Sequence, residues 1–277
     1  MLFKHVNREP DMPLLPVMTL AFMLFLFSKS PVGVNLMVLP RIHGVIERRV
    51  LLNYRADPAV VARLLPVPFR PQLVQGHAIV GICLIRLRGM RPRFVPAWAG
   101  LASENAAHRI AVAWDENDSE KVGVYVPRRD TSSRLNVVAG GRLFPGIQHH
   151  AQFTIDETSD HLHIALRSRD GDTSVRVEAQ PAEKMPEHSV FGDLGRASDF
   201  FANGSLGWSA TPNPTLHHGM KLNCKQWIVR PLTVTLAQSS WFDDTQRFPR
   251  GSILLDHALV MRDIAHEWQA HENLQAC

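Results

Sequence analysis

The residues most suited to chemistry lie in one arginine-rich segment, residues 121–146, which reads KVGVYVPRRDTSSRLNVVAGGRLFPG. Four arginines stand there beside one carboxylate, namely Arg128, Arg129, Arg134 and Arg142 with Asp130. Arginine presents a rigid fork of N–H donors that matches the oxygens of a carboxylate or phosphate. The segment therefore predicts a pocket for a small anion. The alternative is a surface turn whose arginines pair with acidic residues elsewhere in the chain.

A second polar group lies in the preceding segment, SENAAHRIAV at residues 103–112. The alternation is that of a strand, so His108 and Arg109 are expected on opposite faces, and the alanines beside Arg109 leave room for a ligand. We expect Glu104 and His108 to act as acid–base catalysts, although the same residue types also suit a buried ionic network. The expected substrate-binding residues are Asn105, Arg109, Arg128, Arg129, Asp130 and Arg134.

Other chemistries lack the spacing they need. His266 and His271 are five residues apart, whereas the zinc helix of a metalloprotease needs two histidines four apart. His161 and His163 share one strand face but have no acidic or cysteine partner at metal-ligand spacing. No segment matches a phosphate-binding or dinucleotide-binding glycine loop. The sequence therefore predicts neither a metal site nor a cofactor.

Composition limits the classes of partner. The chain has 277 residues, of which 45% are hydrophobic and 20% charged, as in ordinary soluble globular proteins. The net charge is +4, but the basic residues are scattered, which argues against a nucleic-acid surface. The three cysteines, Cys83, Cys224 and Cys277, show no disulfide framework. A reducing compartment, the cytoplasm, is therefore expected.

The N-terminal segment differs from the rest of the chain. Residues 13–27, PLLPVMTLAFMLFLF, are strongly apolar but short for a membrane span, and no clear cleavage site follows them. We interpret residues 1–36 as a tail arising from a false start, as a disordered segment, or as a weak signal or anchor. Met37 precedes the expected single domain, residues 38–270. No stable membrane insertion is expected.

Short strands dominate the remaining pattern. Alternating or continuous apolar runs predict strands at 45–54, 77–88, 107–114, 122–126, 148–155, 161–167 and 174–179. Short helices are expected after Asp57 and at 193–201, and a loop is expected at 204–214. Residues 252–264 suit either a strand or a helix, and their neighbours favour a strand. The expected class is mostly β (α+β), an antiparallel barrel or sandwich with a few short helices.

Five ordered blocks carry a resemblance to a known family. They are VLLNYRADPAVVARLLPVPFRP, SENAAHRIAV, VGVYVPRRDTSSRLNVVAGGRLFPG, SLGWS and FPRGSILLDHALVMRDIAHEW. Together they resemble the YqjF-like family, the domain of unknown function DUF2071, over about residues 41 to 268. That family is similar in fold to acetoacetate decarboxylase. The resemblance implies a closed, mainly antiparallel β-barrel with a central cavity.

The resemblance also marks a difference in chemistry. Decarboxylases of this fold form a Schiff base through a lysine that follows a glycine-rich, arginine-containing turn. The comparable segment here, GGRLFPG, contains no lysine, and the lysines of the domain lie elsewhere, at 121, 184, 221 and 225. The resemblance implies Glu104 as an acid on the cavity wall and Arg109 as a carboxylate clamp.

Two functions are compatible with these residues. The first is a lyase- or hydrolase-like enzyme that acts on a small carboxylate or keto compound without a covalent lysine. The second is a non-catalytic barrel that binds such a compound. A homo-oligomer is compatible with both.

The absent lysine gives a first prediction. Borohydride treatment in the presence of acetoacetate or pyruvate should trap no imine, because no lysine stands where a Schiff base would form. Intact-mass and peptide mass spectrometry provide the measurement. A reduced adduct on Lys221 or Lys225 would contradict the prediction.

Overall fold

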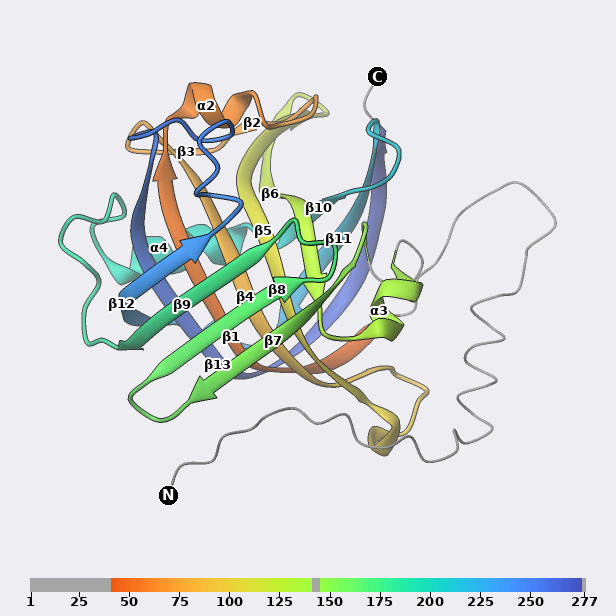
Figure 1. Cartoon of the computed structure of the whole chain (residues 1–277). Coiled ribbons are helices and arrows are strands. Elements are labelled where there is room, and N and C mark those ends of the chain that lie inside the picture. Colours follow the sequence, from red (N-terminus) through yellow and green to blue (C-terminus); the bar gives the residue numbers. More distant parts are fainter. Residues whose placement is uncertain (1–40, 141–144, 276–277) are drawn as a thin grey trace.

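Strands make up most of the computed structural model, which describes residues 41–140 and 145–275 (Figure 1). The strands are β1 (Ile42–Ala56), β2 (Arg70–Pro71), β3 (Leu73–Val74), β4 (His77–Pro92), β5 (Leu101–Glu116), β6 (Ser119–Thr131), β7 (His149–Glu157), β8 (Leu162–Ser168), β9 (Ser174–Pro181), β10 (Leu206–Ala210), β11 (Leu216–Cys224), β12 (Arg230–Ser239) and β13 (Ile253–Gln275). The helices are α2 (Pro58–Ala62), α3 (Arg134–Ala139), α4 (Leu194–Asn203) and the 3-10 helix η1 (Ala97–Ala99). The expected N-terminal tail and Arg142 lie outside the described residues.

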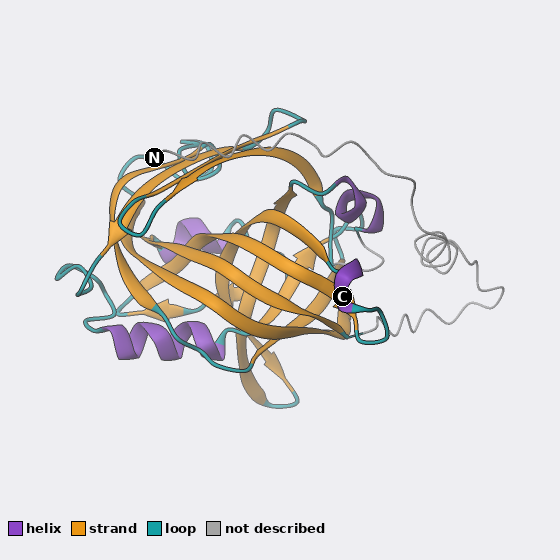
Figure 2. Ribbon diagram, turned by 90° about the horizontal axis from the view of Figure 1, so that it is seen from below, coloured by secondary structure: helices purple, strands orange, loops and turns teal. Residues whose placement is uncertain are grey.

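Five long antiparallel strands, in the order β13-β1-β4-β5-β6, form a wall through the molecule. Each of the two edge strands of this wall pairs with two different strands along its length. The edge strand β6 pairs with β10 at Val124–Val126 and with β7 at Asp130–Thr131, while β13 pairs with β12 and then with β11. Each division closes a ring of hydrogen-bonded strands, one through β10 and β11 and one through β7, β8, β9 and β12 (Figure 2). The expected closed, mainly antiparallel β fold is confirmed.

The wall is buried on both faces. On β1, Val50 and Leu52 pack in one core with Ile164 of β8, whereas Leu51 packs in a second core with Phe201 of α4. Successive strand residues point to opposite faces, so α4 lies on the side of the wall away from β7, β8 and β9 (Figure 1). Double burial explains why the β4 sequence HAIVGICLIRLR is apolar at almost every position.

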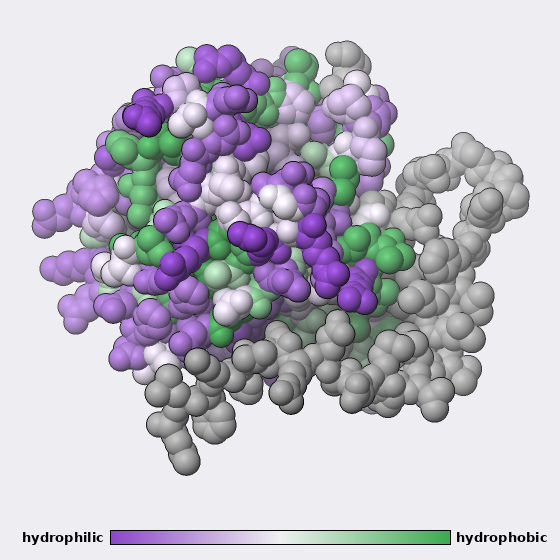
Figure 3. Space-filling model, in the orientation of Figure 1, coloured by the Kyte–Doolittle hydropathy of each residue, from purple (hydrophilic) through white to green (hydrophobic). Residues whose placement is uncertain are grey.

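The outer sheet β7-β8-β9-β12 has one solvated face. Along β9 the exposed positions alternate with buried valines, and they carry polar side chains such as Arg176. The face seen in Figure 3 is accordingly hydrophilic over much of its area, with scattered apolar residues. Among the described residues, no helix has both the length and the apolar character needed to cross a membrane.

Helix caps agree with the local sequence. The Asp57 carboxylate accepts a hydrogen bond from the Ala59 amide at 2.7 Å at the start of α2, with Pro58 as the first helical residue. Asp193 caps α4 in the same way through the Arg196 amide, at 2.9 Å. The ambiguous segment 252–264 is a strand, as favoured, and belongs to the longer β13.

Two expectations about strands were wrong. The segment expected as a loop around Trp208 contains β10, because parallel pairing with β6 supplies its ladder partners. The strand expected at 122–126 does not end before Pro127, since β6 continues to Thr131. The β5–β6 register shifts between His108 and Ile110, so Pro127 falls at an irregularity where it has no direct partner.

A network of paired charges joins the wall to β7. Arg48 is buried, and its guanidinium bonds Glu104 at 2.6 Å and Glu157 at 3.0 Å. Arg86 also bonds Glu104, and Arg262 bonds Glu157. The network therefore fixes β7 against β1, β4, β5 and β13.

This network gives a stability prediction. Glu104→Gln leaves the buried Arg48 cation with less compensating charge, so the free energy of unfolding should fall by about 3 kcal/mol, the lower end for a broken buried pair. Urea denaturation measures the change. Asp115→Asn, in an exposed pair with Arg70, is the control and should leave the midpoint nearly unchanged. Equal effects of the two substitutions would contradict the assignment.

Candidate functional site

A cavity of about 90 Å³ lies on the α4 side of the wall and carries an unusual charge. Three arginines line it, Arg49 on β1, Arg109 on β5 and Arg129 on β6, and we call it the arginine cavity. Cys83 of β4 lies among them, and apolar residues of α4, β11 and the segments near Trp227 and Trp268 complete the lining. No aspartate or glutamate belongs to the lining found in the described part of the chain.

Strand register explains how these residues meet. One row across the wall reads Leu51, Cys83, Ala107 and Arg129, all on the same face. The row on one side reads Asn53, Gly81 and Arg109. The row on the other side reads Arg49, Ile85 and Asn105. In two of these rows a small residue, Gly81 or Ala107, lies between polar ones. A Cβ at Gly81 would meet the Leu52 carbonyl and lie 3.3 Å from Arg109 Nη2, so glycine lets Arg109 lie across the wall.

Arg109 is held by a chain of buried hydrogen bonds. Its Nη2 donates to Asn53 Oδ1, and Asn53 Nδ2 donates to His257 Nε2 at 2.9 Å. His257 Nδ1 therefore carries the proton and donates to Asp256 Oδ2 at 2.6 Å. Burial lowers the pKa of His257 despite the neighbouring Asp256 carboxylate. The Arg109 guanidinium also lies over the Phe201 ring, 4.7 Å from its centroid.

The other two arginines differ in their partners, and Arg49 keeps buried donors without acceptors. Arg49 lies over the Trp227 ring, and its Nε and Nη1 atoms are buried with no hydrogen-bond partner in the described structure. The indole Nε1 of Trp227 is likewise buried without a partner there. Arg129 Nε donates to Ser209 Oγ at 3.0 Å, and burial lowers the pKa of Arg129 to about 10. Buried donors that lack acceptors favour a ligand that supplies oxygens.

A smaller pocket of about 40 Å³ adjoins the arginine cavity and shares Arg129 with it. Asn105 and Asp130 contribute to its lining, together with Asn136 and Gln148. Burial raises the pKa of Asp130, and the neighbouring Arg128 opposes that shift. Four of the expected site residues, Asn105, Arg109, Arg129 and Asp130, therefore line one or other of these two adjoining pockets.

The remaining expected residues lie elsewhere. Glu104 does not lie beside Arg109, because neighbouring residues of a strand alternate between faces and Glu104 belongs to the opposite set. On that opposite face Arg48 and Arg86 hold its carboxylate. His108 faces the same way, between Trp241 and Phe242, and its Nε2 lies 2.9 Å from Ser239 Oγ.

The two arginines after Pro127 divide between faces in the same manner. Arg128 is in register with His108 and pairs with Asp130 and Asp170 at 2.8 and 2.9 Å, whereas Arg129 faces the arginine cavity. Arg134 is exposed on α3. Sequence reasoning did not identify Arg49, Cys83 or Trp227, because they come from distant segments that only the strand register brings together.

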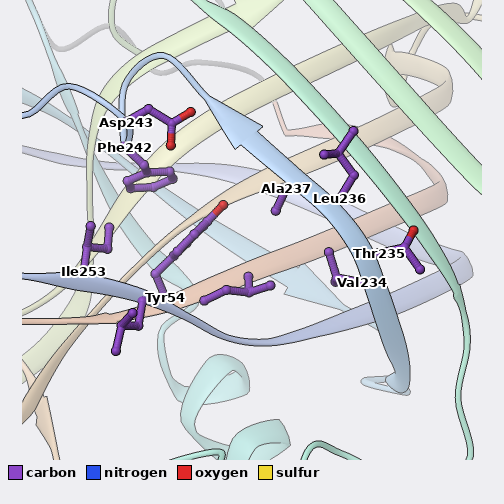
Figure 4. Close-up of a pocket in the computed structure, with 10 residues that line it drawn as sticks. Tyr54, Val234, Thr235, Leu236, Ala237, Phe242, Asp243 and Ile253 are labelled. Atoms are coloured by element: carbon purple, nitrogen blue, oxygen red, sulfur yellow. The ribbon is translucent and has the colours of Figure 1, made fainter. Parts of the chain in front are cut away.

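Two further pockets have a different charge balance. One of about 300 Å³ opens where β12 and β13 diverge, and it holds Tyr54 and Asp243 among apolar residues (Figure 4). Burial, reinforced by Asp243, raises the pKa of Tyr54. The other, of about 450 Å³, is lined by the charges around Arg48, which pair with one another. Neither offers an unpaired cation to a ligand, so the arginine cavity is the stronger candidate for an anion site.

Comparison with known proteins agrees with this architecture. A family model described as DUF2071, an uncharacterized conserved protein, matches residues 45–246 and confirms the family resemblance. No curated protein shows a significant match.

Solved structures share the fold at low identity. Acetoacetate decarboxylase from Legionella pneumophila is 11% identical with a TM-score of 0.53, covering 95% of this chain and 98% of that one. An acetoacetate decarboxylase-like enzyme from Sphingomonas wittichii is 10% identical with a TM-score of 0.51, covering 91% and 98%. The enduracididine biosynthesis enzyme MppR, in complex with pyruvate, is 12% identical with a TM-score of 0.50, covering 89% and 94%.

The buried His108 generates a pH prediction. Burial first, then the charges of Arg128 and Arg247, lower its pKa from 6.5 to about 3. Between these pH values the unfolded chain binds a proton that the folded chain does not, so stability falls as the pH decreases from 6.5. His108→Asn should remove up to about 1.4 kcal/mol per pH unit from that slope.

The measurement is urea denaturation at several pH values. His77→Asn, at an exposed position, serves as the matched control. A His108→Asn variant whose stability depends on pH as steeply as that of the wild type would contradict the prediction.

Proposed function

Because this chain belongs to the DUF2071 family and has the fold of acetoacetate decarboxylase, we propose that its arginine cavity binds a small carboxylate or keto compound. One observation carries the proposal: three guanidinium groups, that of the buried Arg109 and those of the half-buried Arg49 and Arg129, line a cavity whose described lining contains no acidic side chain. Buried arginines are ordinarily paired, as Arg48 is on the opposite face of the wall.

Desolvation of the guanidinium groups favours a bound anion. A guanidinium removed from water loses hydration that only hydrogen bonds and opposite charge restore. An anion that reaches Arg49, Arg109 and Arg129 would supply both, and the low local dielectric strengthens the attraction. The cavity, of about 90 Å³, has room for more than one water-sized group, so it suits a small ligand.

The charge suits any small anion, and the small volume favours short keto acids or carboxylates over phosphorylated metabolites. MppR, a structural relative, is known in complex with pyruvate, which makes pyruvate a suitable probe. An enzyme here would work without a lysine, since no lysine lines the arginine cavity. Non-catalytic binding of the same ligand class is the alternative, and retention of bound pyruvate without turnover would favour it.

The binding prediction compares an arginine of the cavity with an arginine on the exposed face of β9. Arg129→Gln should weaken pyruvate binding roughly tenfold to a hundredfold, because a charge-assisted hydrogen bond contributes about 1.5–3 kcal/mol. Isothermal titration calorimetry measures the affinity, and Arg176→Gln, on the exposed face of β9, is the control.

Neutral methyl pyruvate is the matched ligand control. It should bind poorly, because it lacks the carboxylate. Equal affinity of wild type and Arg129→Gln for pyruvate, or equal affinity for pyruvate and its methyl ester, would overturn the proposed function.

A further inference from the structure

Cys83 lies at the centre of the arginine cavity and contacts two of its cations. Its Sγ is 3.1 Å from Arg109 Nε and 3.6 Å from Arg49 Nη2. A guanidinium has N–H donors and no acceptor, so the sulfur accepts at both contacts. The residue is only 3% exposed, yet it belongs to the lining of the cavity.

Charge balance singles out this thiol. The described lining contains three guanidinium groups and no carboxylate, and Cys83 is the one residue among its members that can become an anion near neutral pH. Burial raises the pKa of Cys83, but the charges of Arg109 and Arg49 outweigh that effect and leave the pKa below its ordinary value. Cys224 differs, since burial raises its pKa.

We propose that Cys83 is a nucleophile of the arginine cavity and that its thiolate adds reversibly to the carbonyl carbon of a bound 2-keto acid. This inference rests on the proposed function, because the carboxylate of the same ligand is held by the arginines. The unpartnered donors of Arg49 and Trp227 suit those carboxylate oxygens.

The step is balanced without any redox partner. The sulfur forms a bond to the carbonyl carbon, the C=O π bond breaks, and its electron pair moves to the oxygen. That oxygen takes a proton from solvent, so thiol and ketone together give a thiohemiketal. A guanidinium beside the oxygen stabilises the negative charge that develops there. Cys83 thereby supplies the cavity with a covalent nucleophile, a part that a lysine amine plays in acetoacetate decarboxylase.

The test follows the carbonyl carbon of pyruvate labelled with carbon-13 at C2. With wild-type protein, the NMR spectrum should gain a resonance in the tetrahedral-carbon region, and Cys224→Ser should retain it. Cys83→Ser should lose that resonance while still binding pyruvate by calorimetry, because serine keeps a hydrogen-bond acceptor for the arginines but does not ionise near neutral pH.

The outcomes separate the two proposals. The role of Cys83 is overturned if wild-type protein binds pyruvate without the tetrahedral resonance. It is also overturned if Cys83→Ser shows the same resonance. Either result leaves the proposed function standing. Absence of pyruvate binding to wild type counts against the proposed function itself, and the adduct falls with it.

Alkylation tests the thiolate without a keto acid. Iodoacetate should modify Cys83 faster than neutral iodoacetamide does, because the arginines attract the anionic reagent. Both reagents should modify Cys83 faster than Cys224, because only the thiolate reacts and the pKa of Cys83 is lowered whereas that of Cys224 is raised. Arg129→Gln should reduce the preference for the anionic reagent, with modification at Cys224 as the internal reference. A Cys83 that resists both reagents in the folded protein, or prefers iodoacetamide, overturns the proposal even if pyruvate binds.

Discussion

Burial of the five-stranded wall on both faces is the constraint on which the rest of the structure depends. The central part of each wall strand sends alternate residues into two separate cores, so the polar residues there must be accommodated within one of them. A one-residue slip between β4 and β5 would exchange the two sets and turn Glu104 toward the face of the wall that carries the arginine cavity. The register therefore decides both stability and chemistry.

The arginines on the two faces of the wall have different kinds of partner. On the outer-sheet side, Arg48 has two carboxylate partners, and the network ties five strands together. On the α4 side, Arg49, its neighbour in sequence, has a thiol and an aromatic ring as partners in the described structure. Pairing serves the fold in the first case. Unpaired, desolvated donors in the second case are what a ligand-binding cavity requires.

Much of this arrangement could be inferred from local sequence, and the rest depends on long-range pairing. Alternation and flanking alanines were sufficient to identify Arg109 as a residue with space beside it, and the rule of opposite faces separated it from His108. Grouping by sequence proximity failed for Glu104, because neighbours in a strand face apart. Cys83 and Arg49 carried no local signal: they reach Arg109 only through the β1–β4–β5 register. Likewise, the β10 strand forms because β6 offers it a parallel edge.

The central claim is that the arginine cavity is an anion site, and bromide bound in a crystal tests it most directly. Anomalous scattering locates bromide without assumptions about the natural ligand. The account predicts a bromide ion within hydrogen-bonding distance of at least two of the guanidinium groups of Arg49, Arg109 and Arg129, displaced when pyruvate is added. Bromide bound at surface arginines while the cavity holds none would contradict it.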